Sequence, residues 1–273
     1  MFKDNLVLVR GGGDLATGVA LRLYRAGIGV VITELPQPLA VRRTVSFAEA
    51  VYEGVWEVEG VRARRVEAEQ LAAALEAGEI PVLIDPQASI LLSSFFHFPV
   101  VIDARLLKTP PPPLPVPVPL HIGLGPGFTA GSDCHAVIET RRSHTLGRVI
   151  WQGPTQPDSG EPEGDPRRVL RAPVDGVLWG VKKIGEHVEE GEVVAVIGNQ
   201  HSVISPFAGV LRGIIHDGLM VKRGMKIGDV DPRNDPSYCY LVSDKALAIG
   251  GGALEAVLSR REIREKLLGD GQA

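Results

Sequence analysis

The chain has 273 residues, 44% of them hydrophobic, and a formal net charge of -4. This length suits two domains of roughly 100–200 residues each, and the slightly acidic balance gives no general reason to expect a nucleic acid partner. The two cysteines, Cys134 and Cys239, exclude a disulfide scaffold and indicate a reducing cytoplasm. No stretch reaches the roughly 18 apolar residues of a membrane span, so no membrane association is expected.

Residues 5–35 predict a strand, a glycine loop, a helix and a second strand. The order is NLVLVR, GGGDLATG, VALRLYRAG and IGVVITEL. The loop fits the dinucleotide-binding pattern as Gly11-x-Gly13-x-x-Ala16, and Glu34 stands where such folds bind ribose hydroxyls. Asp14 opposes this interpretation, because its carboxylate would repel a pyrophosphate at the helix N-terminus. A phosphate-bearing ligand and a ligand-free tight turn therefore both stay open.

Later apolar runs extend the same domain. IPVLIDP, FPVVIDAR and PLHIGLG predict buried strands of a parallel sheet, VEAEQLAAALEAGE an amphipathic helix and VWEVEGVRARRV an inserted hairpin. Residues 109–119, TPPPPLPVPVP, predict a stiff extended connector, because prolines cannot continue a helix and lack amide donors. We therefore expect a Rossmann-like α/β domain over residues 1–151.

Ligands of open α/β sheets bind beyond the carboxyl ends of the strands, so the residues there should converge on one cleft. Arg42 and Arg43 are candidates to supply positive charge to a phosphate, or else are solvated surface arginines. The second glycine loop, GPGFTAG, offers backbone amides to an anion. The residues expected to bind a cofactor are Gly11, Gly12, Gly13, Asp14, Thr17, Glu34, Arg42, Arg43, Asp103, Arg105, Gly125, Gly127 and Thr129.

The stretch DCHAVIET contains two candidate catalytic residues, Cys134 and His135. On a strand they would point to opposite faces, so they could not readily share a metal ion, and no metal site is expected. Cys134 is reactive only at an exposed strand start beside positive charge, and is otherwise a buried small residue. His135 could form an acid/base pair with Glu139 or Asp133, or be a hydrogen-bonded structural residue.

Residues 152–166, rich in Gly and Pro, predict a linker. The segment that starts at Ala172 then repeats from Ser205, at an offset of 33 residues. The pattern resembles the two halves of biotinyl and lipoyl carrier domains, which implies a small all-β barrel-sandwich hybrid over 167–235. The junction between the copies, GNQHSVIS, has no lysine to modify, so neither biotin nor lipoate is expected.

Residues 236–273 predict a C-terminal helical segment, with Ser243 as a helix N-cap. Three consecutive glycines, Gly250 to Gly252, would each cost about 1 kcal/mol inside a helix. They predict either a break between two helices or a close approach to another backbone or a ligand.

Long motifs carry a family resemblance. VRGGGDLATGVALRLYRAG, GLGPGFTAGSDCHAVIET and YCYLVSDKALAIGGGALEAVL resemble the YqeB family of accessory proteins of selenium-dependent molybdenum hydroxylases, over nearly the whole chain. The first domain also looks distantly like the Rossmann part of XdhC-type chaperones, which hold molybdenum cofactor and help load it into xanthine dehydrogenase.

The resemblance implies a maturation role, in which the protein handles the molybdopterin cofactor or its terminal selenium or sulfur ligand for a hydroxylase client. Cys134 would then be a candidate chalcogen relay, and the protein a cofactor chaperone rather than a stand-alone enzyme. Two alternatives stay open: an NAD-type nucleotide-dependent oxidoreductase that uses Gly11, Gly13 and Glu34, and a non-enzymatic scaffold that docks a hydroxylase subunit. The sequence also leaves a homo-oligomer open.

Overall fold

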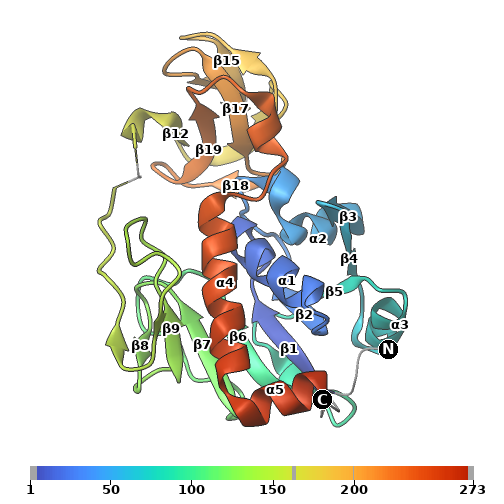
Figure 1. Ribbon diagram of the computed structural model, residues 1–273. Helices are drawn as coiled ribbons and strands as arrows, with labels where there is room; N and C mark the ends of the chain where they lie inside the picture. The colour runs from blue at the N-terminus through green and yellow to red at the C-terminus, as the bar shows by residue number, and fades with distance from the viewer. Residues whose placement is uncertain (1–4, 162–163, 199, 270–273) are drawn as a thin grey trace. The chain divides into compact units, whose positions relative to one another are not determined.

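The computed structural model describes residues 5–161, 164–198 and 200–269, and it divides the chain into two compact units (Figure 1). Unit 1 comprises the described residues up to Pro38, Phe47–Asp158 and those from Val242 onward. Unit 2 comprises Leu39–Ser46 and Ser159–Leu241. Among the described residues, no helix is long and apolar enough to cross a membrane.

Unit 1 is built on a nine-stranded sheet in the order β10-β9-β7-β6-β1-β2-β5-β4-β3. Neighbouring strands from β9 to β4 run parallel, whereas β10 and β3 are antiparallel edge strands. A separate pair joins β8 (Thr129–Ala130) to β11 (Gly153–Pro154). The strands are β1 (Asn5–Arg10), β2 (Val30–Glu34), β3 (Val55–Val58), β4 (Val61–Arg65), β5 (Ile80–Ile84), β6 (His97–Asp103), β7 (Leu120–Leu124), β9 (Ala136–Ile138) and β10 (Val149–Ile150).

The predicted fold class, a Rossmann-like parallel sheet followed by a barrel-sandwich hybrid and a C-terminal helix, was wrong. The large sheet is mixed and several smaller antiparallel sheets accompany it, which makes the chain a mixed α/β protein. The β3–β4 hairpin, which turns at Glu59 and Gly60 with positive φ, adds one antiparallel edge, and β10 adds the other. The C-terminal helices α4 (Asp244–Ser259) and α5 (Arg261–Leu268) are not a separate part, because they belong to unit 1.

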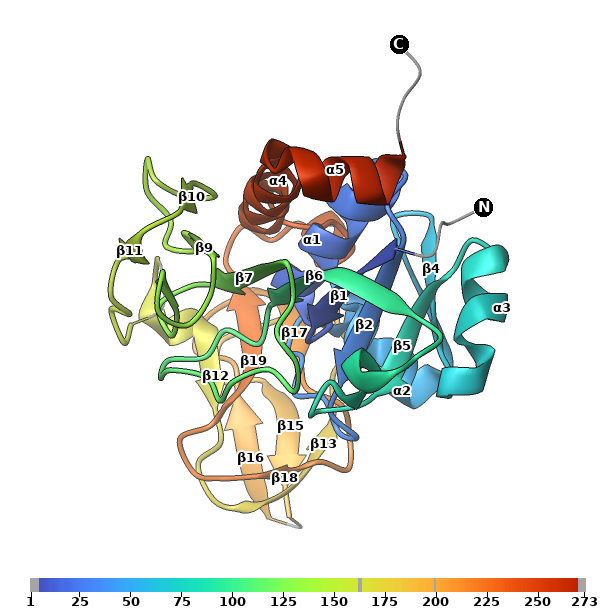
Figure 2. The same ribbon diagram turned by 90° about the horizontal axis from the view of Figure 1, so that it is seen from below.

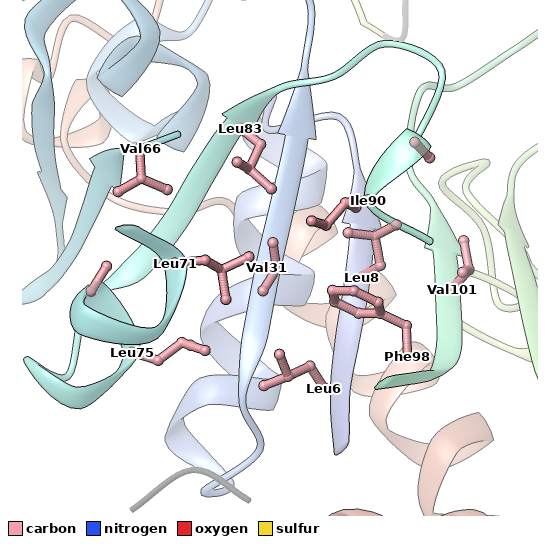
Figure 3. Packing of buried hydrophobic residues seen from close by; sticks show 12 residues of the cluster. Leu6, Leu8, Val31, Val66, Leu71, Leu75, Leu83, Ile90, Phe98 and Val101 are labelled. Atoms are coloured by element: carbon pink, nitrogen blue, oxygen red, sulfur yellow. The ribbon is translucent and has the colours of Figure 1, made fainter. Parts of the chain in front are cut away.

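Helices cover both faces of the large sheet. On one side lie α1 (Asp14–Arg25), α4 and α5 (Figure 2). On the other, side chains of β1, β2, β5 and β6 pack against α3 (Leu71–Glu76) and the 3₁₀ helix η4 (Ser89–Leu92), as Figure 3 shows. Leu114 and Val118 of the proline-rich connector also pack against this cluster, so the connector helps to cover the core. The short elements α2 (Ala50–Glu53), η2 (Phe47–Glu49) and η3 (Ala68–Gln70) complete unit 1.

Glycines allow α1 and α4 to touch backbone to backbone. A Cβ atom added at Gly250 would lie 2.4 Å from the carbonyl oxygen of Gly18, and one at Gly18 would lie 2.5 Å from that of Ala246. A Cβ at Gly252 would lie 1.9 Å from the carbonyl oxygen of Gly147. Gly250 and Gly252 therefore mark close backbone approaches, whereas Gly251 between them does not, and α4 continues through all three without a break.

We predict that Gly250→Ala lowers the thermal unfolding midpoint, since overpacking against the Gly18 backbone costs about 1–3 kcal/mol. Gly251→Ala is the matched control, because nothing lies within 4 Å of its added Cβ atom. That control should stabilise the helix by up to about 1 kcal/mol. Equal effects of the two substitutions on the midpoint would contradict the packing argument.

Unit 2 contains two four-stranded antiparallel sheets, β12-β19-β17-β14 and β16-β15-β13-β18. The sequence repeat is visible in them, because β13, β14 and β15 each begin 33 residues before β17, β18 and β19. The second strand of each copy pairs with the first strand of the other. The elements are η1 (Arg43–Val45), η5 (Pro166–Arg168), β12 (Val169–Arg171), β13 (Gly176–Gly180), β14 (His187–Val188), β15 (Val193–Ile197), β16 (His201–Ile204), β17 (Gly209–Ile214), β18 (Met220–Val221), β19 (Lys226–Asp231) and η6 (Pro236–Cys239).

An ion-pair network surrounds two buried aspartates of β19. Asp229 pairs with Arg168 and Arg212, and Asp231 pairs with Arg212 and Arg233 at 3.1 and 2.6 Å. Burial raises the pKa of Asp231, but hydrogen bonds from Arg233 and the charge of Arg212 outweigh it and lower the pKa to about 2. The network thus keeps Asp231 ionised inside the unit.

The segment Leu39–Ser46 is part of unit 2 although it is distant in sequence from the rest of it. The Nε of Arg43 donates to the carbonyl of Ile214 at 2.8 Å, and an Nη of Arg42 donates to those of Tyr238 and Leu241. Gly213 permits this approach, since an added Cβ would lie 2.6 Å from the Val41 carbonyl oxygen.

We predict that Gly213→Ala destabilises unit 2 by about 1–3 kcal/mol, because the backbone of Val41 cannot move aside cheaply. The repeat supplies its control, Gly180→Ala, at the equivalent position of the first copy. There the nearest atom is a side-chain oxygen of Asp217 at 3.1 Å, so the effect should be smaller. Limited proteolysis of the 39–46 segment and thermal unfolding would measure it, and equal losses would contradict the docking of this segment.

Candidate functional site

The parallel strands of unit 1 end at one edge of the sheet, and backbone bonds tie their ends together. The amide of Gly11 donates to Thr33, that of Ala104 to Arg10 and that of Asp85 to Glu34. The structure therefore brings the first glycine loop together with the ends of β2, β5 and β6.

A charged cluster lies at this edge. The carboxylate of Asp103 is fully buried and accepts from Nε and Nη2 of Arg105, at 2.8 and 2.6 Å. Arg10, also buried, reaches the same carboxylate at 3.4 Å and donates to the carbonyl of Pro86 at 3.0 Å. Burial lowers the pKa of Arg10, and Asp103 opposes that shift. Arg10, Asp103 and Arg105 alone sum to one positive charge, and the neighbouring carboxylate of Asp85, which also raises the pKa of Arg10, offsets it.

The first glycine loop is held mainly by its own neighbours. Gly12 donates to Oε1 of Glu34 at 2.6 Å, and Leu35 donates to Oε2 at 2.7 Å. Burial raises the pKa of Glu34, while these two bonds lower it, with burial the larger effect. Thr17 is buried and donates its hydroxyl to the Gly12 carbonyl. Glu34 and Thr17 thus support the loop, and neither carboxylate oxygen of Glu34 is left without a backbone donor.

Two glycines of this loop have different surroundings. Gly11 has φ +93° and packs against the backbone of Ala104 and Arg105, at 3.4 and 3.6 Å from an added Cβ. Gly13 is the N-cap of α1, and nothing lies within 4 Å of its added Cβ. Asp14, partly exposed, is the first residue of α1. Of the two, Gly11 therefore packs against the chain after β6, and Gly13 has open space where a side chain would stand.

The second glycine loop packs against the chain that follows Arg105. Gly125 has φ +82°, and an added Cβ would lie 2.8 Å from Oγ1 of Thr140. At Gly127 it would lie 2.2 Å from the Leu107 carbonyl oxygen. The amide of Thr129 donates to the carboxylate of Asp133 at 2.9 Å. Close packing accounts for both glycines, and the Thr129 amide is already used within the loop.

Cys134 lies in an environment that keeps its thiol protonated. It packs with Phe128, Ala130 and Val137, and its Sγ donates to the carbonyl of Ala136 at 3.2 Å. Burial raises the pKa of the thiol to about 11. The strand begins only at Ala136, so the alternation expected from Asp133 onward does not place this side chain. Its role as a chalcogen relay stays a prediction without electrostatic support.

His135 and Glu139 have separate roles. His135 is exposed, and its Nδ1 accepts the backbone amide of His121 at 2.9 Å. Glu139 is buried, and its carboxylate accepts the amides of Arg141 and Gln156, both at 2.8 Å. The structure therefore does not bring these two side chains together as an acid/base pair.

His121 was missed by sequence reasoning. It is buried on β7, with the edge of its ring against Phe128, and its Nε2 has no hydrogen-bond partner among the described residues. Burial lowers its pKa to about 4, Asp103 opposes the shift, and His135 and Arg10 add to it. The available signal was a single polar residue inside the apolar run PLHIGLG. Of the other predicted residues, Arg42 and Arg43 lie in unit 2 and bind carbonyls there.

The sheet and its edge define an α/β protein with a buried arginine–carboxylate cluster beside a glycine loop that opens a helix. No family model matches the chain. It is 48% identical over 258 residues to the Escherichia coli (strain K12) protein named "Uncharacterized protein YqeB", across 93% of this chain and 47% of that protein. This similarity supports the YqeB family expected from the motifs. The chain spans about half the length of the curated relative it matches.

Solved structures offer only distant likenesses. A succinylglutamate desuccinylase/aspartoacylase from Rhodobacter sphaeroides is 20% identical, over 30% of this chain and 29% of that one, with a TM-score of 0.23. An aspartoacylase family protein from Mesorhizobium loti is 14% identical, over 83% and 84%, with a TM-score of 0.28. The product-bound ectoine utilization protein EutE from Ruegeria pomeroyi is 11% identical, over 82% and 56%, with a TM-score of 0.23. Scores this low carry no argument about fold or function.

We predict that acid destabilises unit 1 through His121. Its pKa is about 4 in the folded protein and 6.5 for a free histidine side chain, so the unfolded state binds the proton first. Stability should be complete above about pH 6.5 and fall by about 3 kcal/mol as the pH drops toward 4. His121→Gln should flatten this slope in urea unfolding curves, whereas His97→Gln, at an exposed histidine, should not. An unchanged slope in His121→Gln would contradict the assignment.

Proposed function

We propose that this protein binds a phosphate-bearing ligand at the strand-end edge of unit 1, and that it serves in the maturation of a selenium-dependent molybdenum hydroxylase. The ligand would be the molybdopterin cofactor, and the protein would hold it or its terminal selenium or sulfur ligand for a client enzyme. The maturation role rests on the motif resemblance, and the choice of site rests on geometry.

One observation supports the proposed location of the anion site. Gly11 packs on the backbone of Arg105, so the half-buried guanidinium of Arg105 and the open N-cap glycine of α1 lie at the same strand ends. A helix N-terminus and a guanidinium both favour an oxyanion, and the carboxylate of Asp14 in the first turn of α1 opposes it.

The NAD-type alternative has less support from this geometry. A dinucleotide fold uses the acidic residue after the second strand to bind ribose hydroxyls. Here the carboxylate of Glu34 accepts the amides of Gly12 and Leu35 instead, and Gly12 belongs to the loop itself. Glu34 thus has a structural task that accounts for its presence.

We predict that purified protein retains molybdenum cofactor through gel filtration, as followed by pterin fluorescence. In the Gly13→Asp variant the amount of retained pterin should fall at least about tenfold. The new carboxylate would stand at the N-terminus of α1 and repel the phosphate. Gly251→Asp is the matched control, because its glycine is equally open but lies within α4. Failure of the wild-type protein to retain pterin, or equal losses in both variants, would count against the proposal.

A further inference from the structure

Arg105 is held by Asp103 through one side of its guanidinium group. Its Nε donates to Oδ1 and its Nη2 to Oδ2, and its backbone amide lies 3.4 Å from Oδ1. A guanidinium carries five N–H donors in a planar fork. Asp103 uses the Nε side of that fork, so within the described part of the chain three N–H bonds at the Nη1–Nη2 end remain for another acceptor.

Asp103 itself cannot be the group that meets a ligand. Its side chain is fully buried, whereas that of Arg105 is 26% exposed. The buried Arg10 also contacts Asp103, and Arg10 itself donates a second hydrogen bond to the carbonyl of Pro86. Arg10 therefore fixes the carboxylate of Asp103, and that carboxylate orients Arg105.

The backbone on both sides of the cluster is in the left-handed region. Leu106, next to Arg105, has φ +56°, and Ala88, two residues after Pro86, also has φ +56°. Residues other than glycine adopt this conformation rarely and at a cost. Gly11 and Gly127 pack on either side of the segment 104–107. The chain thus holds Arg105 in place through several independent contacts.

We propose that Asp103, anchored by Arg10, is a positioning residue that aims the Nη1–Nη2 end of Arg105 at a phosphoryl group, which it binds in a bidentate manner. This inference rests on the proposed function and deepens it, because it names the side chain and the geometry that recognise the anion. Arg105 alone would contact the ligand; Asp103 and Arg10 act through it.

The same local fork occurs twice more among the described residues. Asp165 holds Arg167 and Asp231 holds Arg233 through Nε and Nη2 in the same way. The fork is therefore a local structure and not a site in itself. Asp231 also pairs with a second arginine, Arg212, whose side chain is 18% exposed. The fork at Arg105 differs because its second arginine, Arg10, is only 4% exposed, and because Gly11 of the first glycine loop packs on the backbone of Arg105. Asp165 of unit 2, whose side chain is partly exposed, supplies a matched control.

Whether Asp103→Asn tightens or weakens the binding of inorganic phosphate distinguishes a positioning role from a purely electrostatic one. If Asp103 acted only as a nearby negative charge, Asp103→Asn would remove repulsion and tighten the binding of inorganic phosphate. A positioning role predicts the opposite: Arg105 must then be ordered when the anion binds, which weakens affinity by about tenfold. Arg105→Lys keeps the charge but cannot form the fork, so it should weaken binding by about tenfold as well.

The test is a double-mutant cycle, with the dissociation constant for inorganic phosphate measured by calorimetry in the wild-type protein, Asp103→Asn, Arg105→Ala and the double variant. We expect the effect of Asp103→Asn to vanish in the Arg105→Ala background, because Asp103 acts through Arg105. A merely structural defect would persist there. Asp165→Asn should leave the affinity unchanged, and thermal unfolding would check the fold of each variant.

The outcomes distinguish this inference from the proposed function. No phosphate binding by the wild-type protein would overturn both. Weaker binding in Arg105→Ala with unchanged or tighter binding in Asp103→Asn would leave the anion site in place and overturn the positioning role. If Asp103→Asn does not fold, Arg105→Lys decides, since an affinity equal to that of the wild-type protein would overturn the inference.

Discussion

A fully buried carboxylate, that of Asp103, connects three strand ends of the large sheet. Asp103 is the last residue of β6, and Arg105 lies two residues beyond it. Arg10 comes from β1 and extends the connection to the loop after β5. Buried ion pairs seldom add net stability, because desolvation offsets the attraction, but removal of one partner leaves a costly unpaired charge. The cluster is therefore better explained by what it holds in place than by the stability it adds.

Close backbone contact is the second constraint on unit 1. Gly18 and Gly250 bring α1 and α4 together, and Gly11 and Gly127 pack on the segment that follows β6. These contacts explain most glycines that resemble phosphate-binding residues in the sequence. Gly13, which has open space around it, is left as the glycine that suits a ligand.

Sequence reasoning found the first strand, loop and helix because an apolar run, three glycines and an amphipathic pattern lie next to one another. It also named Asp103 and Arg105, which follow an apolar run directly. It missed Arg10 and His121, because each is one polar residue within a buried strand and its partners are distant in sequence. It predicted the hairpin that became β3 and β4 but misjudged the rest of the sheet as parallel, since the two-residue edge strand β10 carries little signal about its direction.

The sequence by itself determined what depends on near neighbours. The Asp-x-Arg forks form between residues two apart, and the repeat at an offset of 33 residues reappears as matching strands. Only the tertiary structure decided that Leu39–Ser46 belongs to unit 2, that α4 lies against α1 and that one fork of the three is anchored by Arg10. Such contacts follow from strand order and helix packing, which join residues far apart in the chain and therefore leave no local pattern.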